Sequence, residues 1–390
     1  MRLSRFLAAL LLIAPVALAD APTIDPADDA KHFGSPERAL FWTPEEKVAG
    51  FRNMDRLFPT RIVATGEDSF PLPSTFSALG AVEIQDGERA LTVDEYFKRQ
   101  NVAGLLVIHD GRVVYERYGL GNSGDTRWVS FSVTKSVVSM LVGAAVRDGY
   151  IESIDERVTA YLPRLAGSAY DDVTIRHLLQ MASGVEWNED YADPESDVNS
   201  MPRDAVGMYR YMGKKNRVAK PGEAFNYNTA ESQIVGALVR AAIGNNLSTY
   251  LSNKIWRPFG MESDAVWLLT EEGGGETGGC CISATLRDYG LIGLFALRGG
   301  RLADGTAVLP DDWMRRSTEP SPASERYGYL WWLGEGGAYS AIGIFGQGIH
   351  IDPEQNVVIA LQSAREVASQ ADDWSLQGAL FEAITAALRD

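Results

Sequence analysis

Ser132 and Lys135 have the clearest potential for chemistry in this sequence, because they stand three positions apart just before an apolar run, residues 136–146, that predicts a helix. Residues three apart on a helix are neighbours, so the lysine amine can reach the serine hydroxyl. A desolvated lysine that is neutral part of the time can activate a serine as a nucleophile. The partial positive charge and free N–H groups of a helix N-terminus would stabilise a developing oxyanion. The pair therefore predicts nucleophilic catalysis by Ser132.

An alternative interpretation gives the same pair a structural task. Ser132 would cap the helix, and Lys135 would extend into solvent from its first turn. Acidic residues, rather than a lysine, are favoured in a first helical turn, so this interpretation runs against the usual preference. A serine and a lysine at this spacing are also common by chance. The prediction therefore depends on the segments that surround the pair.

Strand and helix patterns indicate the elements that would hold the pair in place. Two β-rich runs, 103–109 and 112–118, are joined by Asp110-Gly111, a dipeptide typical of type I′ hairpin turns. A mostly helical stretch covers about 174–259, with a capped start at Thr174. The last hundred residues return to strand patterns and end in a helix, at 329–333, 339–345, 348–352, 357–362 and 376–388.

These patterns predict an α+β protein whose antiparallel sheet takes strands from both ends of the chain and is flanked by helices. The expected parts are a leader over 1–19, an N-terminal extension over 20–85, a sheet domain formed by 86–165 and 285–390, and a mainly helical domain inserted over 166–284. The extension lacks sustained periodicity and is expected to be irregular. The glycine-dense segment 273–279 is expected to be a connecting loop. A site would lie where the sheet and the helices meet.

The N-terminus and the net charge limit the possible partners. Residues 1–19 resemble a secretory leader, with Arg2 and Arg5 before an apolar stretch and Ala17-Leu18-Ala19 as a cleavage site. We therefore expect export to the periplasm. No later segment has about 18 consecutive apolar residues, so no membrane span is expected. The net charge of −16 becomes −18 when Arg2 and Arg5 leave with the leader, which argues against nucleic acid or anionic membrane partners.

Cys280 and Cys281 are the only cysteines, and they are adjacent. In an oxidising compartment they would form a vicinal disulfide, remain two buried thiols, or pair between molecules. We expect buried thiols first.

Several further motifs follow in a fixed order and identify a family. They are Ser132 to Lys135, Ile154 to Val158 with Tyr161-Leu162-Pro163, His177 to Gly184, Pro221 to Tyr227, and Gly343 to Gln347. Together they resemble the serine β-lactamase and penicillin-recognising hydrolase superfamily, in its class C-like branch. The most similar group is that of the 6-aminohexanoate-dimer hydrolases, which are linear-amide hydrolases and esterases. The resemblance implies a β-lactamase/transpeptidase-like fold.

The resemblance also implies roles for individual residues. Ser132 would be acylated, while Lys135 and Tyr227 would transfer protons. The backbone N–H groups of Ser132 and Ile344 would form the oxyanion hole. The implied substrate is a small amide or ester, and neither a metal nor an organic cofactor is implied. Substrate contacts are expected from Tyr191, Asn228, Thr229 and Gly343.

Tyr227 and Tyr191 each have a purely structural interpretation as well. Tyr227 would be a buried aromatic residue whose hydroxyl is satisfied within the fold. Tyr191 would be an aromatic residue that packs its own loop.

Two departures from the family pattern bear on the substrate. Thr229 stands where the tyrosine motif often has an asparagine, which here is Asn228. No cation occupies Ala341-Ile342-Gly343, where the family has K-T-G or H-T-G. The group that would bind the carboxylate of a penicillin or of a terminal D-alanine is therefore missing.

These departures favour an esterase or linear amidase. A β-lactamase or D-Ala-D-Ala peptidase stays an alternative, as does a catalytically idle binding or scaffold protein. The oligomeric state is left open by the sequence.

Overall fold

The computed structural model describes residues 22–76 and 79–389, and the predicted leader lies outside them. Its main sheet has six strands in the order β5-β4-β12-β11-β10-β9, with antiparallel neighbours throughout. The strands are β4 (Val102–His109), β5 (Arg112–Tyr118), β9 (Trp332–Leu333), β10 (Tyr339–Ile342), β11 (Gly348–Asp352) and β12 (Val357–Ser363). The prediction of a sheet built from both ends of the chain is confirmed.

The first hairpin forms as its sequence predicts. Asp110 and Gly111, with φ of 50° and 71°, take the left-handed conformations that a type I′ turn requires. His109 pairs with Arg112 across the turn. The central strands β4 and β12 are buried over nearly their whole length, which explains why their sequences are almost continuous apolar runs.

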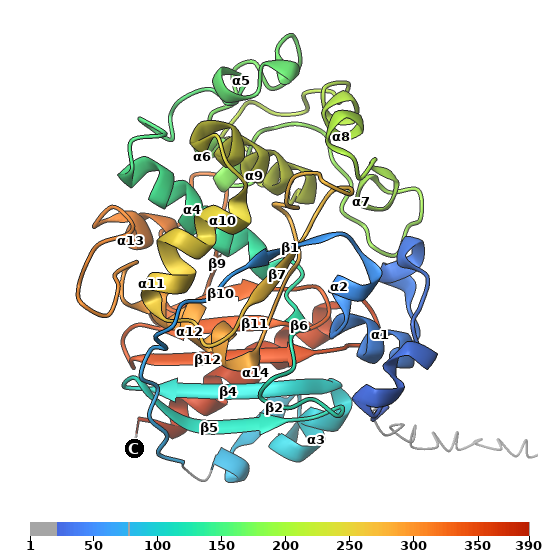
Figure 1. The fold of residues 1–390 in the computed structure, drawn as a ribbon, viewed down its shortest axis with the longest axis vertical. Helices are drawn as coiled ribbons and strands as arrows, with labels where there is room; N and C mark the ends of the chain where they lie inside the picture. The colour runs from blue at the N-terminus through green and yellow to red at the C-terminus, as the bar shows by residue number, and fades with distance from the viewer. Residues whose placement is uncertain (1–21, 77–78, 390) are drawn as a thin grey trace, which may run out of the picture.

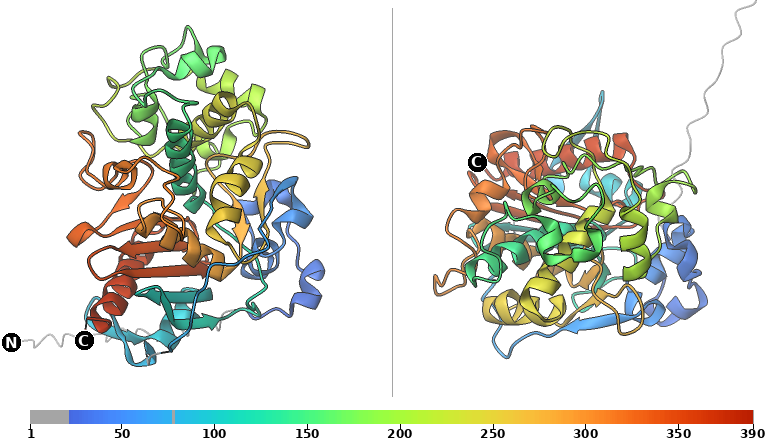
Figure 2. Two further views of the ribbon diagram at one scale, coloured as in Figure 1. Left: turned by 60° about the vertical axis from the view of Figure 1, so that its left-hand side comes forward. Right: turned by 90° about the horizontal axis from the view of Figure 1, so that it is seen from above.

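Helices cover both faces of this sheet (Figures 1 and 2). Alternate residues of β12 point to opposite faces, so that Val358 packs with α12 (Leu286–Leu297) and Ile359 packs with α14 (Ala371–Ala387). The α14 face also carries α3 (Val93–Arg99) and the hairpin of β2 (Glu83–Asp86) and β3 (Arg89–Thr92). The sheet is therefore the middle of three layers.

The segment between the two halves of the sheet is mainly helical, as predicted, and forms the upper part of the molecule in Figure 1. Its longest helices are α4 (Val133–Arg147) and α9 (Thr229–Ile243), which pack against one another. The others are α5 (Val158–Tyr161), η4 (Pro163–Leu165), α6 (Ile175–Leu179), α7 (Asp197–Ser200), α8 (Ala205–Met212), α10 (Leu247–Leu251), η5 (Ser252–Trp256) and α11 (Arg257–Phe259). The exact domain bounds stay a prediction.

The N-terminal extension is not irregular, so that expectation is wrong. It contains α1 (Pro44–Phe51), which begins with a capping box, and β1 (Thr60–Val63), which pairs with β7 (Ala265–Leu268) in a second sheet. The extension also contains the helices η1 (Pro26–Lys31), η2 (Pro36–Phe41), α2 (Met54–Leu57) and η3 (Leu79–Ala81). The other strands of the second sheet are β6 (Trp128–Val129) and β8 (Ile282–Ala284). Two short helices lie later in the chain, α13 (Trp313–Ser317) and η6 (Glu335–Gly337). These elements are too short to show a sequence period.

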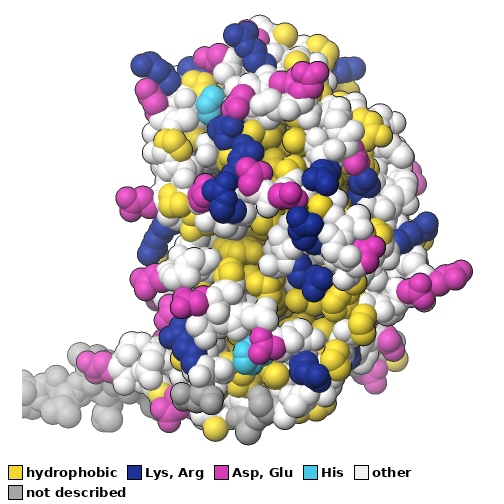
Figure 3. Space-filling view, turned by 90° about the vertical axis from the view of Figure 1, so that its left-hand side faces the viewer, with side chains coloured by type: hydrophobic (Ala, Val, Ile, Leu, Met, Phe, Trp, Pro, Cys, Tyr) yellow, Lys and Arg dark blue, Asp and Glu magenta, His cyan; other side chains and the backbone are white. Residues whose placement is uncertain are grey.

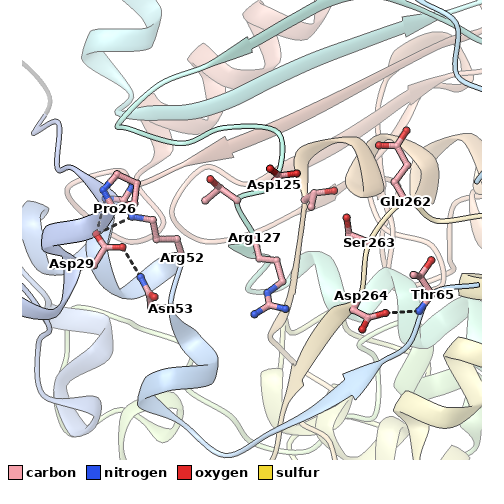
Figure 4. Close-up of a pocket in the computed structure, with 12 residues that line it drawn as sticks. Pro26, Asp29, Arg52, Asn53, Thr65, Asp125, Arg127, Glu262, Ser263 and Asp264 are labelled. Atoms are coloured by element: carbon pink, nitrogen blue, oxygen red, sulfur yellow. Dashed lines mark hydrogen bonds and ion pairs between the residues drawn. The ribbon is translucent and has the colours of Figure 1, made fainter.

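A buried ion pair lies within the extension, and its arginine also contacts the body (Figure 4). Arg52 Nη2 lies 2.7 Å from Asp29 Oδ1, both side chains are at most 3% exposed, and Arg52 also donates to the carbonyl of Leu120. Removing either partner would leave a buried charge without compensation. A polar hollow of about 600 Å³ adjoins this pair, and none of the predicted catalytic or binding residues lines it.

Cys280 and Cys281, just before β8, are joined as a vicinal disulfide, so the expectation of buried thiols is wrong. Pairing of neighbouring cysteines depends on the backbone conformation of those two residues, which composition does not specify. Among residues 22–76 and 79–389, the structure contains no helix with the length and apolar character needed to cross a membrane.

Candidate active site

Ser132 is the residue immediately before α4, but its side chain makes no capping hydrogen bond to that helix. Phe131, the residue before it, has a φ of 44°, a conformation that costs energy in a bulky residue and is commonly found at functional sites. The Ser132 hydroxyl accepts a hydrogen bond of 2.8 Å from Lys135 Nζ. Because Ser132 makes no side-chain capping bond and Lys135 is only 1% exposed, the structural interpretation of this pair is wrong.

Lys135 is held between the serine and a backbone carbonyl. Its Nζ also donates to the oxygen of Gly279 at 2.7 Å. Burial lowers the pKa of Lys135 to about 8, although the nearby Glu189 carboxylate acts in the opposite direction. A substantial fraction of the amine is therefore neutral in mildly alkaline solution.

Gly279 belongs to the glycine-dense loop, whose part in the site the sequence did not reveal. A Cβ on Gly279 would lie 2.9 Å from the Thr229 carbonyl oxygen, so the loop needs a glycine to pass this close to α9. Gly278 also passes close to α9, because a Cβ on Gly278 would lie 2.4 Å from the Ser232 carbonyl oxygen. The density of glycines is the only sequence feature that marks this loop. It does not indicate that a backbone carbonyl of the loop accepts from Lys135, because every residue type carries such a carbonyl.

Tyr227 lies beside the serine–lysine pair. Its ring stacks on Trp332 at 5.5 Å between centroids, and Lys135 Nζ is 5.2 Å from the centre of the Tyr227 ring. Burial and the Glu189 carboxylate raise the pKa of the phenol, while hydrogen bonding to Ser132 partly offsets that rise. The hydroxyl is therefore protonated at neutral pH and directed at the serine.

Glu189 is a site residue that the sequence did not indicate. Its carboxylate accepts hydrogen bonds from the Tyr191 hydroxyl at 2.5 Å and from the Thr229 N–H at 2.9 Å, and also from the Thr229 hydroxyl and the Trp187 indole. It links two of the predicted substrate-contacting residues. Glu189 stands in a loop that contains several other acidic residues, so the sequence did not distinguish it from them.

Asn228 and Gly343 have structural tasks in this arrangement. Asn228 is 1% exposed and its Oδ1 caps α9 by accepting from the Glu231 N–H at 3.0 Å, which directs that side chain inward. Gly343 donates its N–H to the Gln347 oxygen at 2.8 Å, and a Cβ there would lie 2.5 Å from the Ser130 oxygen. This close approach brings the segment before Ser132 against the segment that carries Ile344.

The two backbone N–H groups predicted for the oxyanion hole donate to no acceptor in the described part of the chain. Neither the Ser132 N–H nor the Ile344 N–H is used by a helix, strand or turn. Unpaired N–H groups are costly when buried, so two of them near one serine suit a ligand oxygen.

Three phenylalanines connect these segments to the N-terminal extension. The rings of Phe131 and Phe345 lie 5.1 Å apart, and Phe51 of α1 contacts both, at 5.0 and 5.3 Å. Phe51 and Phe345 are fully buried. The residue before Ser132 and the residue after Ile344 are thus clamped by one ring from the extension.

A cleft of about 1040 Å³ opens at this point, and Glu189, Tyr191, Tyr227 and Ile344 are among the residues that line it. On the side of the molecule that faces left in Figure 1, hydrophobic side chains lie in a hollow bordered by charged ones (Figure 3). Among the described residues, no three His, Cys, Asp or Glu side chains are grouped so that they could hold a metal ion.

Comparison with solved structures supports the fold. A Bacillus anthracis protein, provisionally named a 6-aminohexanoate-dimer hydrolase, is 23% identical with a TM-score of 0.79, covering 88% of this chain and 95% of its own. A family VIII carboxylesterase is 16% identical with a TM-score of 0.55, covering 72% and 92%. The predicted β-lactamase/transpeptidase-like fold is thereby confirmed.

Sequence relatives include a 6-aminohexanoate-dimer hydrolase of Paenarthrobacter ureafaciens, 28% identical over 90% of each chain. Esterase EstB of Burkholderia gladioli is 27% identical over 43% of this chain and 48% of its own. The family model described as Beta-lactamase matches residues 90–380, which is most of the chain. This protein therefore belongs to the beta-lactamase family of serine hydrolases.

Proposed function

We propose that this protein hydrolyses linear amide or ester bonds through an acyl-enzyme on Ser132. The observation that carries the proposal is the contact between the buried amine of Lys135 and the Ser132 hydroxyl, at 2.8 Å, with the Tyr227 hydroxyl beside them. A buried lysine of lowered pKa is a suitable base for a serine.

In this mechanism the Ser132 proton moves to neutral Lys135 as Oγ forms a bond to the substrate carbonyl carbon. The N–H groups of Ser132 and Ile344 hold the resulting oxyanion. Tyr227 donates its proton to the leaving nitrogen or oxygen as that bond breaks, and Lys135 returns a proton to the tyrosinate. Water then attacks the acyl-enzyme with the same groups acting in reverse, which releases an acid and restores Ser132.

Substrate contacts in the proposal come from Tyr191 and Thr229, which the Glu189 carboxylate holds together at the cleft. Gly343 allows the close approach that places Ile344. Asn228 caps α9 through its Oδ1, and its Nδ2 has no partner among the described residues.

A β-lactamase or D-Ala-D-Ala peptidase is the rival proposal, and relatives with those names are 22% identical over less than half of the chain. Ala341 and Ile342 place no cation on β10 for a substrate carboxylate. Rapid turnover of nitrocefin, exceeding that of simple esters, would support the rival.

Covalent labelling tests the proposal directly. The purified protein is incubated with a small fluorophosphonate and, separately, with p-nitrophenyl esters of graded chain length. Intact mass and peptide mapping should place one label on Ser132, and nitrophenol release should be catalytic. Label on another residue, or no label together with no turnover, would favour the idle scaffold.

The pH dependence of kcat/KM should follow the protonation of Lys135. Burial lowers the pKa of this amine to about 8, and only the neutral amine accepts the serine proton. We therefore expect kcat/KM for a neutral ester to rise through about pH 8 and to level off above it, in assays over about pH 6 to 10. A flat profile, or a fall with pH in that range, would contradict the assignment of Lys135 as the base.

Replacing Phe51 with leucine should slow catalysis although Phe51 does not line the cleft. The smaller side chain loosens the contact with Phe131 and Phe345, which flank the two oxyanion donors. We expect kcat to fall about tenfold, with KM little changed and stability lower by about 1 kcal/mol.

Phe259→Leu is the matched control for this variant. Phe259 is equally buried and contacts Phe70 and Phe295, not the site. Equal rate losses in the two variants would show that the effect is general loosening.

A further inference from the structure

The vicinal disulfide lies between two contacts with the segment that carries the serine–lysine pair. Just before it, the Gly279 carbonyl accepts from Lys135 Nζ at 2.7 Å. Just after it, the Ile282 N–H donates to the hydroxyls of Ser130 and Thr134, at 3.0 and 2.9 Å. The two cross-linked residues therefore connect the acceptor of the lysine to β8, which is anchored on the same segment.

The second sheet holds the backbone of the disulfide from the other side. The Cys280 carbonyl accepts from the Trp267 indole at 3.2 Å, and the Cys281 carbonyl accepts from the Leu268 N–H at 3.2 Å. With the Gly279 carbonyl bound to the lysine, three consecutive carbonyls are in use. A change of backbone torsion at either cysteine would therefore disturb at least one of these hydrogen bonds.

The disulfide restricts exactly these torsions. Each residue has two soft backbone torsions, and the ring that the cross-link closes contains one from each cysteine. A disulfide stabilises a fold chiefly by closing a loop in the unfolded chain, and that stabilisation grows with loop length. Here the cross-linked residues are one position apart, so this contribution is minimal. The main effect of the bond is therefore to hold the local backbone of the folded protein.

The side chains of the disulfide lie among residues of the candidate active site. Cys281 is 2% exposed and belongs to the same buried apolar cluster as Phe131 and Ile344. Cys280 is half-buried and packs against that cluster, as Tyr191 does. One of these neighbours precedes the serine, one carries a predicted oxyanion donor, and one lines the cleft.

We propose that the Cys280–Cys281 disulfide is a positioning element of the active site, which fixes the Gly279 carbonyl so that Lys135 keeps its amine against Ser132. This inference rests on the proposed function. With the bond broken, the carbonyl shifts, the amine spends less time at the serine, and water gains access to it. Proton transfer from the serine is sensitive to such a displacement.

Reduction of the wild-type protein tests the proposal without changing its sequence. Cys280 and Cys281 are the only cysteines, so a disulfide reductant has no other target in the chain. A water-soluble phosphine gives two electrons to the S–S bond. Water supplies two protons to the resulting thiols and its oxygen to the phosphine oxide. Alkylation after denaturation, followed by intact mass, counts the thiols before and after treatment.

The dithiol enzyme should have about tenfold lower kcat for p-nitrophenyl acetate, with KM little changed. Burial lowers the pKa of Lys135 to about 8, so access of water should move the rise in rate to higher pH. Glu189 and Tyr227, the titratable side chains beside this lysine, are chemically unchanged by reduction. Re-oxidation should restore both the rate and its pH dependence.

Cys280→Ala/Cys281→Ala is the second measurement, and it decides the question if the folded protein resists reduction. Alanine removes both sulfur atoms without placing an unpaired hydroxyl in the apolar cluster. The variant should match the dithiol enzyme in kcat and in pH dependence. Added phosphine should leave the variant unchanged, which controls for other effects of the reductant.

The proposal is overturned if the untreated protein already carries two free thiols, or if loss of the disulfide leaves kcat at the wild-type value. It is also overturned if the rate falls equally at every pH, in proportion to the folded fraction measured by circular dichroism, because that result means general loosening. If Ser132→Ala retained the turnover of p-nitrophenyl acetate, the proposed function itself would fail. That result is separate from the outcome for the disulfide.

Discussion

Ser132→Ala is expected to lower kcat/KM for p-nitrophenyl esters by at least about 10³-fold and to abolish labelling by a fluorophosphonate. The substitution removes the atom that forms the acyl bond but leaves the N–H groups of the oxyanion hole in place. A small residual rate is expected, because those donors still act on an attacking water. Little structure is lost, since the Ser132 hydroxyl only accepts from Lys135 and meets Tyr227.

Ser139→Ala is the matched control for this result. Ser139 lies on the same helix, is fully buried, and its hydroxyl has no partner among the described residues. Replacing Ser139 with alanine also removes one serine hydroxyl, but about two helical turns from Ser132. The activity of Ser139→Ala should therefore be unchanged. If Ser132→Ala kept wild-type turnover of every ester and amide tested, hydrolysis through Ser132 would be excluded.

Residue type and spacing put Ser132 and Lys135 forward as candidates, and the family resemblance added Tyr227. The structure brings the three side chains together, and their catalytic roles are a proposal. The hairpin at Asp110-Gly111 was equally readable, since its turn chemistry is local. The apolar runs of β4 and β12 likewise predicted buried strands.

The parts that were missed depend on backbone atoms and tertiary contacts. The Gly279 carbonyl that binds Lys135 could come from any residue type, so no pattern marks it. Glu189 gains its role only because the fold brings Tyr191 and Thr229 to it. Strand β1 has four residues and pairs with a partner about 200 residues later, beyond the range of periodicity.

Lys135→Met is expected to reduce kcat/KM about 10³-fold, because the methionine has similar length but cannot accept the serine proton. The rise in rate through about pH 8 should disappear with it, since burial sets the pKa of this lysine at that value. The Gly279 carbonyl also loses its donor, so we expect stability to fall by about 1–3 kcal/mol. Thermal unfolding at fixed pH measures the second effect separately from the rate.

Lys135→Arg separates a base from a mere positive charge at this position. Arginine is effectively always protonated in proteins, so it can donate to the Gly279 oxygen but cannot take the proton of Ser132. If Lys135 acts as the base, Lys135→Arg should be about as slow as Lys135→Met while recovering part of the lost stability. Recovery of activity by the arginine would instead mean that charge alone matters, and the proton would then have to pass from Ser132 to Tyr227. That route would require a tyrosinate, which burial and the Glu189 carboxylate both disfavour by raising the pKa of the Tyr227 phenol.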